Sequence, residues 1–69
     1  MHAQFAALSA RELDVLAQVA LGCTDAEAAK RLSLNPETMK SYLCSATAKL
    51  GAHTRHEAVA KARRVRLLP

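Results

Sequence analysis

One short pattern, which recurs three times, marks where helices begin in this chain of 69 residues. It reads Ser/Thr-x-x-Glu and stands at positions 9–12, 24–27 and 54–57. In such a capping box, the hydroxyl accepts a hydrogen bond from the backbone N–H three residues on, and the glutamate reaches back to the N–H of the capping residue. A single box is weak support for a helix, but three at this spacing predict three helix starts.

Apolar spacing and stop signals extend these starts into four helices. We expect them over residues 10–21, 25–32, 36–50 and 55–65, where apolar residues recur three and four positions apart. The Asn-Pro pair at 35–36 supplies the cap and first residue of the third helix, and a glycine follows the first and third. The residues expected to face the core are Leu13, Leu16, Val19, Ala20, Ala28, Ala29, Leu32, Met39, Leu43, Ala46, Leu50, Ala58, Val59, Ala62 and Val65.

The composition argues against a β-protein and against two domains. With two glycines, two prolines, no tryptophan and aromatic residues only at Phe5 and Tyr42, the chain lacks the turn signals of a small sandwich or barrel. The length suits one domain, which we place at residues 8–69, with residues 1–7 as a leader or linker. The sequence therefore predicts an all-α fold of four helices.

Catalysis and metal binding find no support in the residue spacing. No Ser–His–Asp or Cys–His set and no glycine-rich phosphate loop can be placed. Cys23, Cys44, His53 and His56 lack the close pairs of a zinc site. We expect a protein that is not an enzyme and holds no metal, cofactor or small-molecule ligand. The absence of a Cys-x-x-Cys pair, a signal peptide or a long apolar run predicts a reduced, cytoplasmic protein without a membrane partner.

Positive charge gathers near the end of the chain. Ten lysines and arginines against six acidic residues give a net charge of +4. Up to Ala52 the two signs balance at five each, so the whole excess lies in residues 53–69. Such a balance suits a polyanionic partner.

The order of the second and third helices is that of a helix-turn-helix. A short helix and a turn precede a longer helix, at 36–50, whose apolar stripe is narrow and whose other face carries mostly short polar side chains. In this motif the second helix enters the DNA major groove, which is about 12 Å wide and admits a helix only if its outer side chains do not hold it off.

Several segments of the chain resemble the LuxR-type DNA-binding domain, which is also the output domain of NarL/FixJ response regulators. The resemblance covers about residues 8–66, and its most specific part is Lys-Leu-Gly at 49–51 followed by Arg-x-Glu-Ala-Val at 55–59. It implies a four-helix domain that binds double-stranded DNA as a homodimer and regulates transcription. The other matching segments are Leu8-Ser9-Ala10-Arg11-Glu12, Ala20-x-Gly22-x-Thr24-x-x-Glu27-x-Ala29-x-x-Leu32 and Thr38-Met39-Lys40-x-Tyr42-Leu43.

The resemblance also assigns roles to single positions. Those that would contact bases are Lys40, Ser41, Cys44 and Ser45. Those that would contact phosphate or brace the scaffold are Thr24, Thr38, Lys49 and Arg55. The fourth helix would form the dimer, with Val59, Arg63 and Val65 as the contact residues.

The chain departs from the family pattern at five positions. Ala10 replaces the usual proline, and Tyr42 and His56 replace a frequent histidine and threonine. Ala28 and Ala46 stand where larger aliphatic residues are usual, which predicts a thinner core or closer helices.

Some residues keep more than one interpretation. Cys44 is a contact to a thymine methyl, a redox-sensitive thiol or a half-buried filler, and the inert roles are favoured because no strongly basic residue is near it in sequence. Cys23 and the ring of Tyr42 are expected to pack in the core. The basic run at 63–66 suits DNA backbone, another partner or a solvated helix end.

Two other functions compete with the DNA-binding regulator. One is the promoter-reading region of a sigma factor, which would bind RNA polymerase, although the fourth helix argues against it. The other is a protein-interaction module with little affinity for DNA, which the modest charge of the third helix favours. If the chain is a transcription regulator, RNA polymerase is a second expected partner besides DNA.

Overall fold

The structure is a computed structural model, and it describes residues 8–69. This part of the chain forms four α-helices. They are α2 (Ala10–Ala20), α3 (Asp25–Leu32), α4 (Pro36–Lys49) and α5 (Arg55–Arg64), and no strand occurs within this range. The all-α prediction is therefore confirmed. The leader or linker that we assigned to residues 1–7 lies outside the described residues.

Two of the three expected capping boxes are complete. At α2 and α3, the Ser9 and Thr24 hydroxyls accept from the backbone N–H three residues on, and the glutamate side chain accepts from the cap's own N–H. At α5 only half of the box forms, because the carboxylate of Glu57 accepts from the N–H of His53 at 2.7 Å instead. The backbone differs at the same position, because Thr54 has a φ of −134°, against −79° and −71° at the other two caps.

All four helices end in the same left-handed turn. The residues at positions 22, 33, 51 and 66 have φ values between 57° and 87°. In each turn the next residue donates its N–H back to a carbonyl five positions earlier, which is the Schellman motif. Glycine was the expected stop signal at positions 22 and 51, whereas Ser33 and Arg66 adopt this conformation with a side chain.

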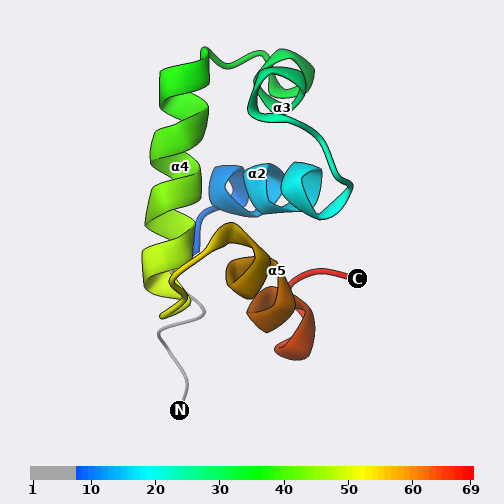
Figure 1. Cartoon of the computed structure of the whole chain (residues 1–69), viewed down its shortest axis with the longest axis vertical. Coiled ribbons are helices and arrows are strands. Elements are labelled where there is room, and N and C mark those ends of the chain that lie inside the picture. Colours follow the sequence, from blue (N-terminus) through cyan, green and yellow to red (C-terminus); the bar gives the residue numbers. More distant parts are fainter. Residues whose placement is uncertain (1–7) are drawn as a thin grey trace.

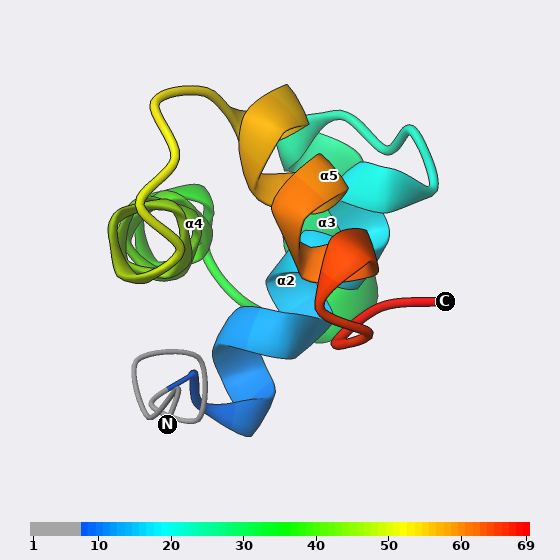
Figure 2. The same cartoon turned by 90° about the horizontal axis from the view of Figure 1, so that it is seen from below.

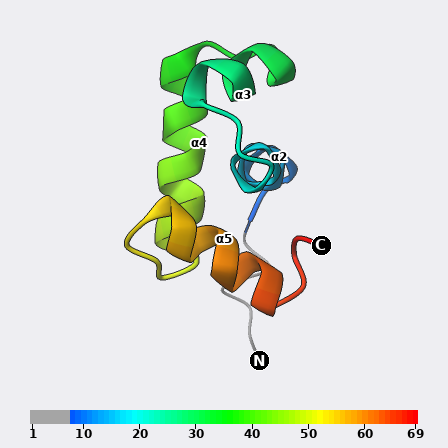
Figure 3. The same cartoon turned by 45° about the vertical axis from the view of Figure 1, so that its right-hand side comes forward.

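The helices are arranged so that α4 forms one side of the molecule. Figures 1 and 3 show α4 upright, α3 against one end, α5 against the other, and α2 crossing between them. Figure 2, which looks along α4, shows the other three helices on one side of it. The opposite side of α4 is left uncovered by any other helix of the described chain.

The core follows the predicted stripes on α3 and α4 and departs from them on α2 and α5. Val15 is fully buried, although it was not among the expected core residues of α2. Leu13, which was expected to face the core, is only half-buried. The face of α2 that points to the core is instead formed by residues 12, 15, 16 and 19, which recur at helical spacing. One of these residues, Glu12, is charged. Val65 is 37% exposed because α5 ends at Arg64 and the chain then turns. The buried residues expected from the sequence are Leu16, Ala28, Ala29, Met39, Leu43, Ala46, Leu50, Ala58, Val59 and Ala62.

The two alanines that replace larger family residues lie at the centre of this core. Ala28 on α3 and Ala46 on α4 are both fully buried. Because their side chains are small, the backbones of these helices can pack closely around Met39, which is also fully buried. The ring of Tyr42 packs against the edge of the same cluster, as expected.

Candidate nucleic-acid interface

The uncovered side of α4 carries a stripe of exposed, mostly short side chains. Lys40, Ser41 and Cys44, three of the four expected base contacts, are all exposed there. Glu37 and Ala48 continue the stripe at helical spacing and are exposed as well. The apolar stripe on the other side of the helix is buried. No long side chain except that of Lys40 stands in the middle of this surface, so another surface can approach α4 closely.

A groove runs beside this stripe, between α4 and the segment that leads into α5. Its volume is about 490 Å³. Lys40, Cys44 and Thr47 line it from α4, and Thr54 and Arg55 line it from the start of α5. Two cationic side chains and two hydroxyls therefore border the exposed face of α4, which is the composition of a surface that receives phosphate.

Arg55 is held in this groove by Asp25, the first residue of α3. The Nη1 and Nη2 atoms of Arg55 donate to Oδ1 and Oδ2 of Asp25, at 2.7 Å and 3.4 Å. The hydrogen bond from Arg55 lowers the pKa of Asp25, and the charges of Arg55 and Lys40 lower it further, against a smaller opposing effect of burial. The hydrogen bond to Asp25 in turn raises the pKa of Arg55. This pair ties the starts of α3 and α5 together.

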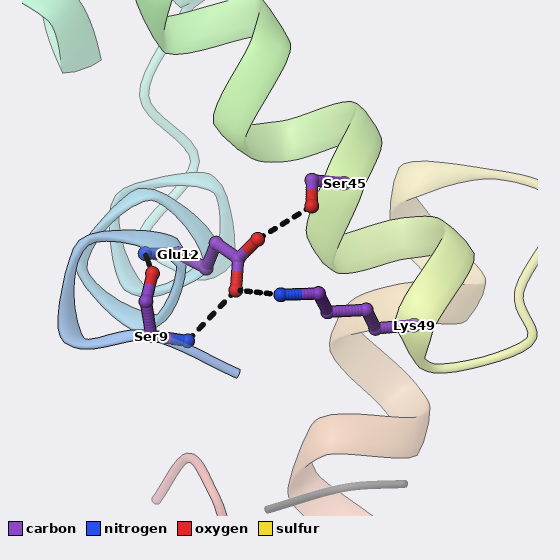
Figure 4. A network of polar contacts seen from close by, with 4 residues as sticks. All are labelled: Ser9, Glu12, Ser45 and Lys49. Atoms are coloured by element: carbon purple, nitrogen blue, oxygen red, sulfur yellow. Dashed lines mark hydrogen bonds and ion pairs between the residues drawn. The ribbon is translucent and has the colours of Figure 1, made fainter. Parts of the chain in front are cut away.

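A second polar contact fixes α4 against α2. Within residues 8–69, Glu12 is the buried charged residue, at 4% exposure. Its carboxylate accepts hydrogen bonds from Ser45 Oγ at 2.5 Å, from Lys49 Nζ at 3.0 Å and from the backbone N–H of Ser9 at 2.7 Å (Figure 4). Burial alone would raise the pKa of Glu12, but these three donors outweigh it and lower the pKa to about 2. We had expected only a capping role for Glu12, since nothing in the sequence pairs it with residues more than 30 positions away.

The structure therefore divides the expected DNA-contact residues into two groups. Lys40, Ser41 and Cys44 lie on the open face of α4. Ser45 and Lys49 point to α2 and bind Glu12. For Lys49 the resemblance implied either a phosphate contact or a bracing role, and the structure shows the bracing contact. Ser45 makes the same kind of contact.

The two threonines also take part in local structure. The hydroxyl of Thr24 accepts from the N–H of Glu27 at the start of α3. Thr38 is half-buried, and its N–H donates to the side chain of Asn35, which caps α4. Their phosphate contacts, like the base contact of Ser45, stay predictions.

The expected dimer residues on α5 differ in exposure. Val59 is only 7% exposed and belongs to the core, so it offers little surface to a second chain. Arg63 and Val65 are exposed. Arg63 lines a hollow of about 470 Å³ between α5 and the end of α2, to which His56, Val59 and Ala60 also contribute.

The cysteines and histidines do not gather. Cys44 is exposed, while Cys23 is half-buried and lies 3.6 Å from the side-chain oxygen of Gln18. In residues 8–69 no three His, Cys, Asp or Glu side chains come close enough to hold a metal ion. None of α2 to α5 is long and apolar enough to cross a membrane.

The fold and this surface define a helix-turn-helix domain, in which α3 and α4 form the motif and α4 is its open second helix. The sequence model of the bacterial regulatory proteins of the luxR family matches residues 6–62. The chain belongs to this family of DNA-binding transcription regulators, and the sequence-based assignment is confirmed.

Two known proteins are similar to the chain. The HTH-type transcriptional activator RamA of Corynebacterium glutamicum is 64% identical over 62 residues, which are 90% of this chain and 22% of RamA. The crystal structure of the response regulator ChrA of a heme-sensing two-component system superposes with a TM-score of 0.85 at 35% identity, over 90% of this chain and 31% of ChrA. The chain thus spans less than a third of either protein.

Proposed function

We propose that this domain reads a specific sequence of double-stranded DNA by placing α4 in the major groove. The observation that supports this most directly is the open face of α4, where Lys40, Ser41 and Cys44 stand exposed with no helix of the described chain covering them. The ammonium of Lys40 would donate to the O6 and N7 acceptors of guanine, which no other base presents together in the major groove.

Arg55 and the neighbouring groove would position the domain on the DNA backbone. The guanidinium lies at the border of the α4 face, and Thr47 and Thr54 line the same groove. Contacts of this kind hold the register of a protein on the duplex but carry no sequence information themselves.

The domain would act as a homodimer through α5. The family resemblance motivates this, and the exposed Val65 and the exposed Arg63, which lines the hollow on α5, supply surface for it. Val59 is mostly in the core and would contribute only the small exposed part that lines this hollow. A dimer of this kind reads two half-sites about one helical turn of DNA apart.

The wider role follows from similarity to longer proteins. By analogy with RamA and ChrA, the domain would be the output part of a larger cytoplasmic regulator, and RNA polymerase would be its partner in activation. It would not be an enzyme and would need no metal, cofactor or small-molecule ligand of its own.

Selection from a random duplex pool tests this function. The chain is incubated with the pool at moderate salt, and the retained duplexes are sequenced beside those retained by Lys40→Ala and Lys30→Ala variants. We expect a pair of enriched half-sites, lost with Lys40→Ala and kept with Lys30→Ala, because Lys30 is an equally exposed cation at the end of α3.

Two results would contradict the proposal. Retention of every duplex alike, with a folded chain, would mean that binding is only electrostatic. No retention at low salt would favour the protein-interaction module.

A further inference from the structure

The ion pair between Asp25 and Arg55 places a negative charge next to a cation that lines the groove beside α4. Asp25 begins α3, and its carboxylate reaches the first residue of α5. Lys40 on α4 is close enough for its charge to act on the same carboxylate. Three helices therefore converge on one acidic side chain at the edge of the DNA-facing groove.

The geometry of the pair leaves Arg55 able to bind phosphate without leaving Asp25. A guanidinium carries five N–H donors, and two of them are directed at Asp25. The side chain of Arg55 is 40% exposed, against 30% for that of Asp25. The other donors of Arg55 can therefore meet a phosphate while the bond to Asp25 holds the side chain in one rotamer.

We propose that Asp25 is a positioning residue that sets the selectivity of duplex binding through Arg55. This inference rests on the function proposed above and names a residue that acts on its specificity. On the correct duplex, Arg55 meets its phosphate already oriented, so little side-chain entropy is lost on binding. On a duplex held in another register, phosphates approach the Asp25 carboxylate without this compensation and are repelled.

The same arrangement limits binding to arbitrary DNA. Non-specific affinity depends on the number of cations that replace counterions on the phosphates. A carboxylate that neutralises Arg55 removes most of one such cation from the loosely bound state. Asp25 therefore weakens non-specific binding more than specific binding.

The experiment compares Asp25→Asn with Asp14→Asn, since each removes one negative charge and Asp14 is an exposed acid of α2 that does not line the groove. For each variant, Kd is measured for the selected operator and for an unrelated duplex of equal length, over a range of salt concentrations. Asp25→Asn should lower the ratio of specific to non-specific affinity by about threefold to fivefold. It should also steepen the salt dependence of non-specific binding by about 0.9 in log K against log salt. Asp14→Asn should affect binding to both duplexes alike and leave the ratio unchanged.

A double-mutant cycle tests whether the effect passes through Arg55. In an Arg55→Gln background, Asp25→Asn should change the affinity ratio much less than in the wild type, because the group that Asp25 positions is gone and only the direct repulsion by its carboxylate remains. Thermal unfolding of each variant identifies those that have simply lost the fold.

The inference is overturned if a folded Asp25→Asn variant keeps the wild-type ratio, matches Asp14→Asn, or acts equally with and without Arg55. These outcomes leave the proposed function standing, since the wild-type chain still selects its operator. If the wild-type chain binds no duplex, the proposed function itself fails.

Discussion

At the scale of single residues, Glu12 is the side chain whose surroundings change its chemistry most. Its position in a capping box accounts for one hydrogen bond to its carboxylate, that from Ser9. The other two come from Ser45 and Lys49 on α4, so the same carboxylate that starts α2 also sets how α4 lies against it (Figure 4). A shift of its pKa from 4.5 to about 2 corresponds to about 3 kcal/mol of stability.

This residue predicts how the domain unfolds in acid. Because the pKa of Glu12 is lower in the folded chain than in the unfolded one, its contribution is complete above about pH 5 and is lost as the pH falls toward 2. Glu12→Gln should therefore cost about 2–3 kcal/mol at pH 7 and almost nothing near pH 2. Urea unfolding at several pH values measures this.

The control is Asp14→Asn, which removes an exposed charge from the same helix. It should change stability by less than about 0.5 kcal/mol at pH 7. A Glu12→Gln curve that runs parallel to the wild type at every pH would show that the carboxylate charge is not the stabilising feature.

At the scale of helices, the starts were more predictable than the ends. Capping hydroxyls act on backbone groups three residues away, so the sequence shows them directly, as at α2 and α3. The end of α5 carries no such signal, because Arg66 takes a left-handed φ of 65° that favours glycine. The N–H of Leu67 bonds the carbonyl of Ala62, and this contact holds the turn in place.

The cost of that conformation can be measured by substitution. Arg66→Gly should stabilise the domain by about 0.5–1 kcal/mol, since a left-handed residue with a side chain costs about 1–2 kcal/mol and glycine loses part of this gain in the unfolded state. Arg64→Gly removes the same charge two residues earlier, at the last residue of α5, and should destabilise by up to about 1 kcal/mol. Thermal unfolding compares the two, and equal effects of the same sign would mean that charge and not backbone conformation decides.

At the scale of the whole molecule, pairing within the fold reduces the cations available to DNA. The sequence carries a net charge of +4, yet Lys49 binds Glu12, Arg55 binds Asp25 and Lys61 lies 3.8 Å from Glu57. Arg63 on α5 donates to the carbonyl of Pro69, and Figures 1 and 2 show this end of the chain directed away from α4. The net charge already counts the acids of these pairs, but its whole excess lies in residues 53–69, so it overstates the electrostatic attraction at the α4 face.

This distribution predicts a moderate salt dependence for binding to the operator. Lys40 and Arg55 are the cations proposed for the interface, so log K against log salt should have a slope of roughly −2 per domain. Arg55→Gln should reduce the slope by about 1, and Lys30→Ala should leave it unchanged. Fluorescence anisotropy at salt concentrations from about 50 to about 200 mM measures this slope. A slope near zero would contradict a phosphate-bound interface.

The four helices, most of the buried stripes and the family could be predicted from the sequence, because capping, helical period and stop signals act between residues a few positions apart. The packing of α2 against α4 places Glu12 on the core face of α2 and turns Ser45 and Lys49 toward it rather than outward. The tertiary structure also brings Asp25 to Arg55, beside the open face of α4. These contacts join residues about 30 or more positions apart, and their partners are set by how the helices pack, which no local pattern records.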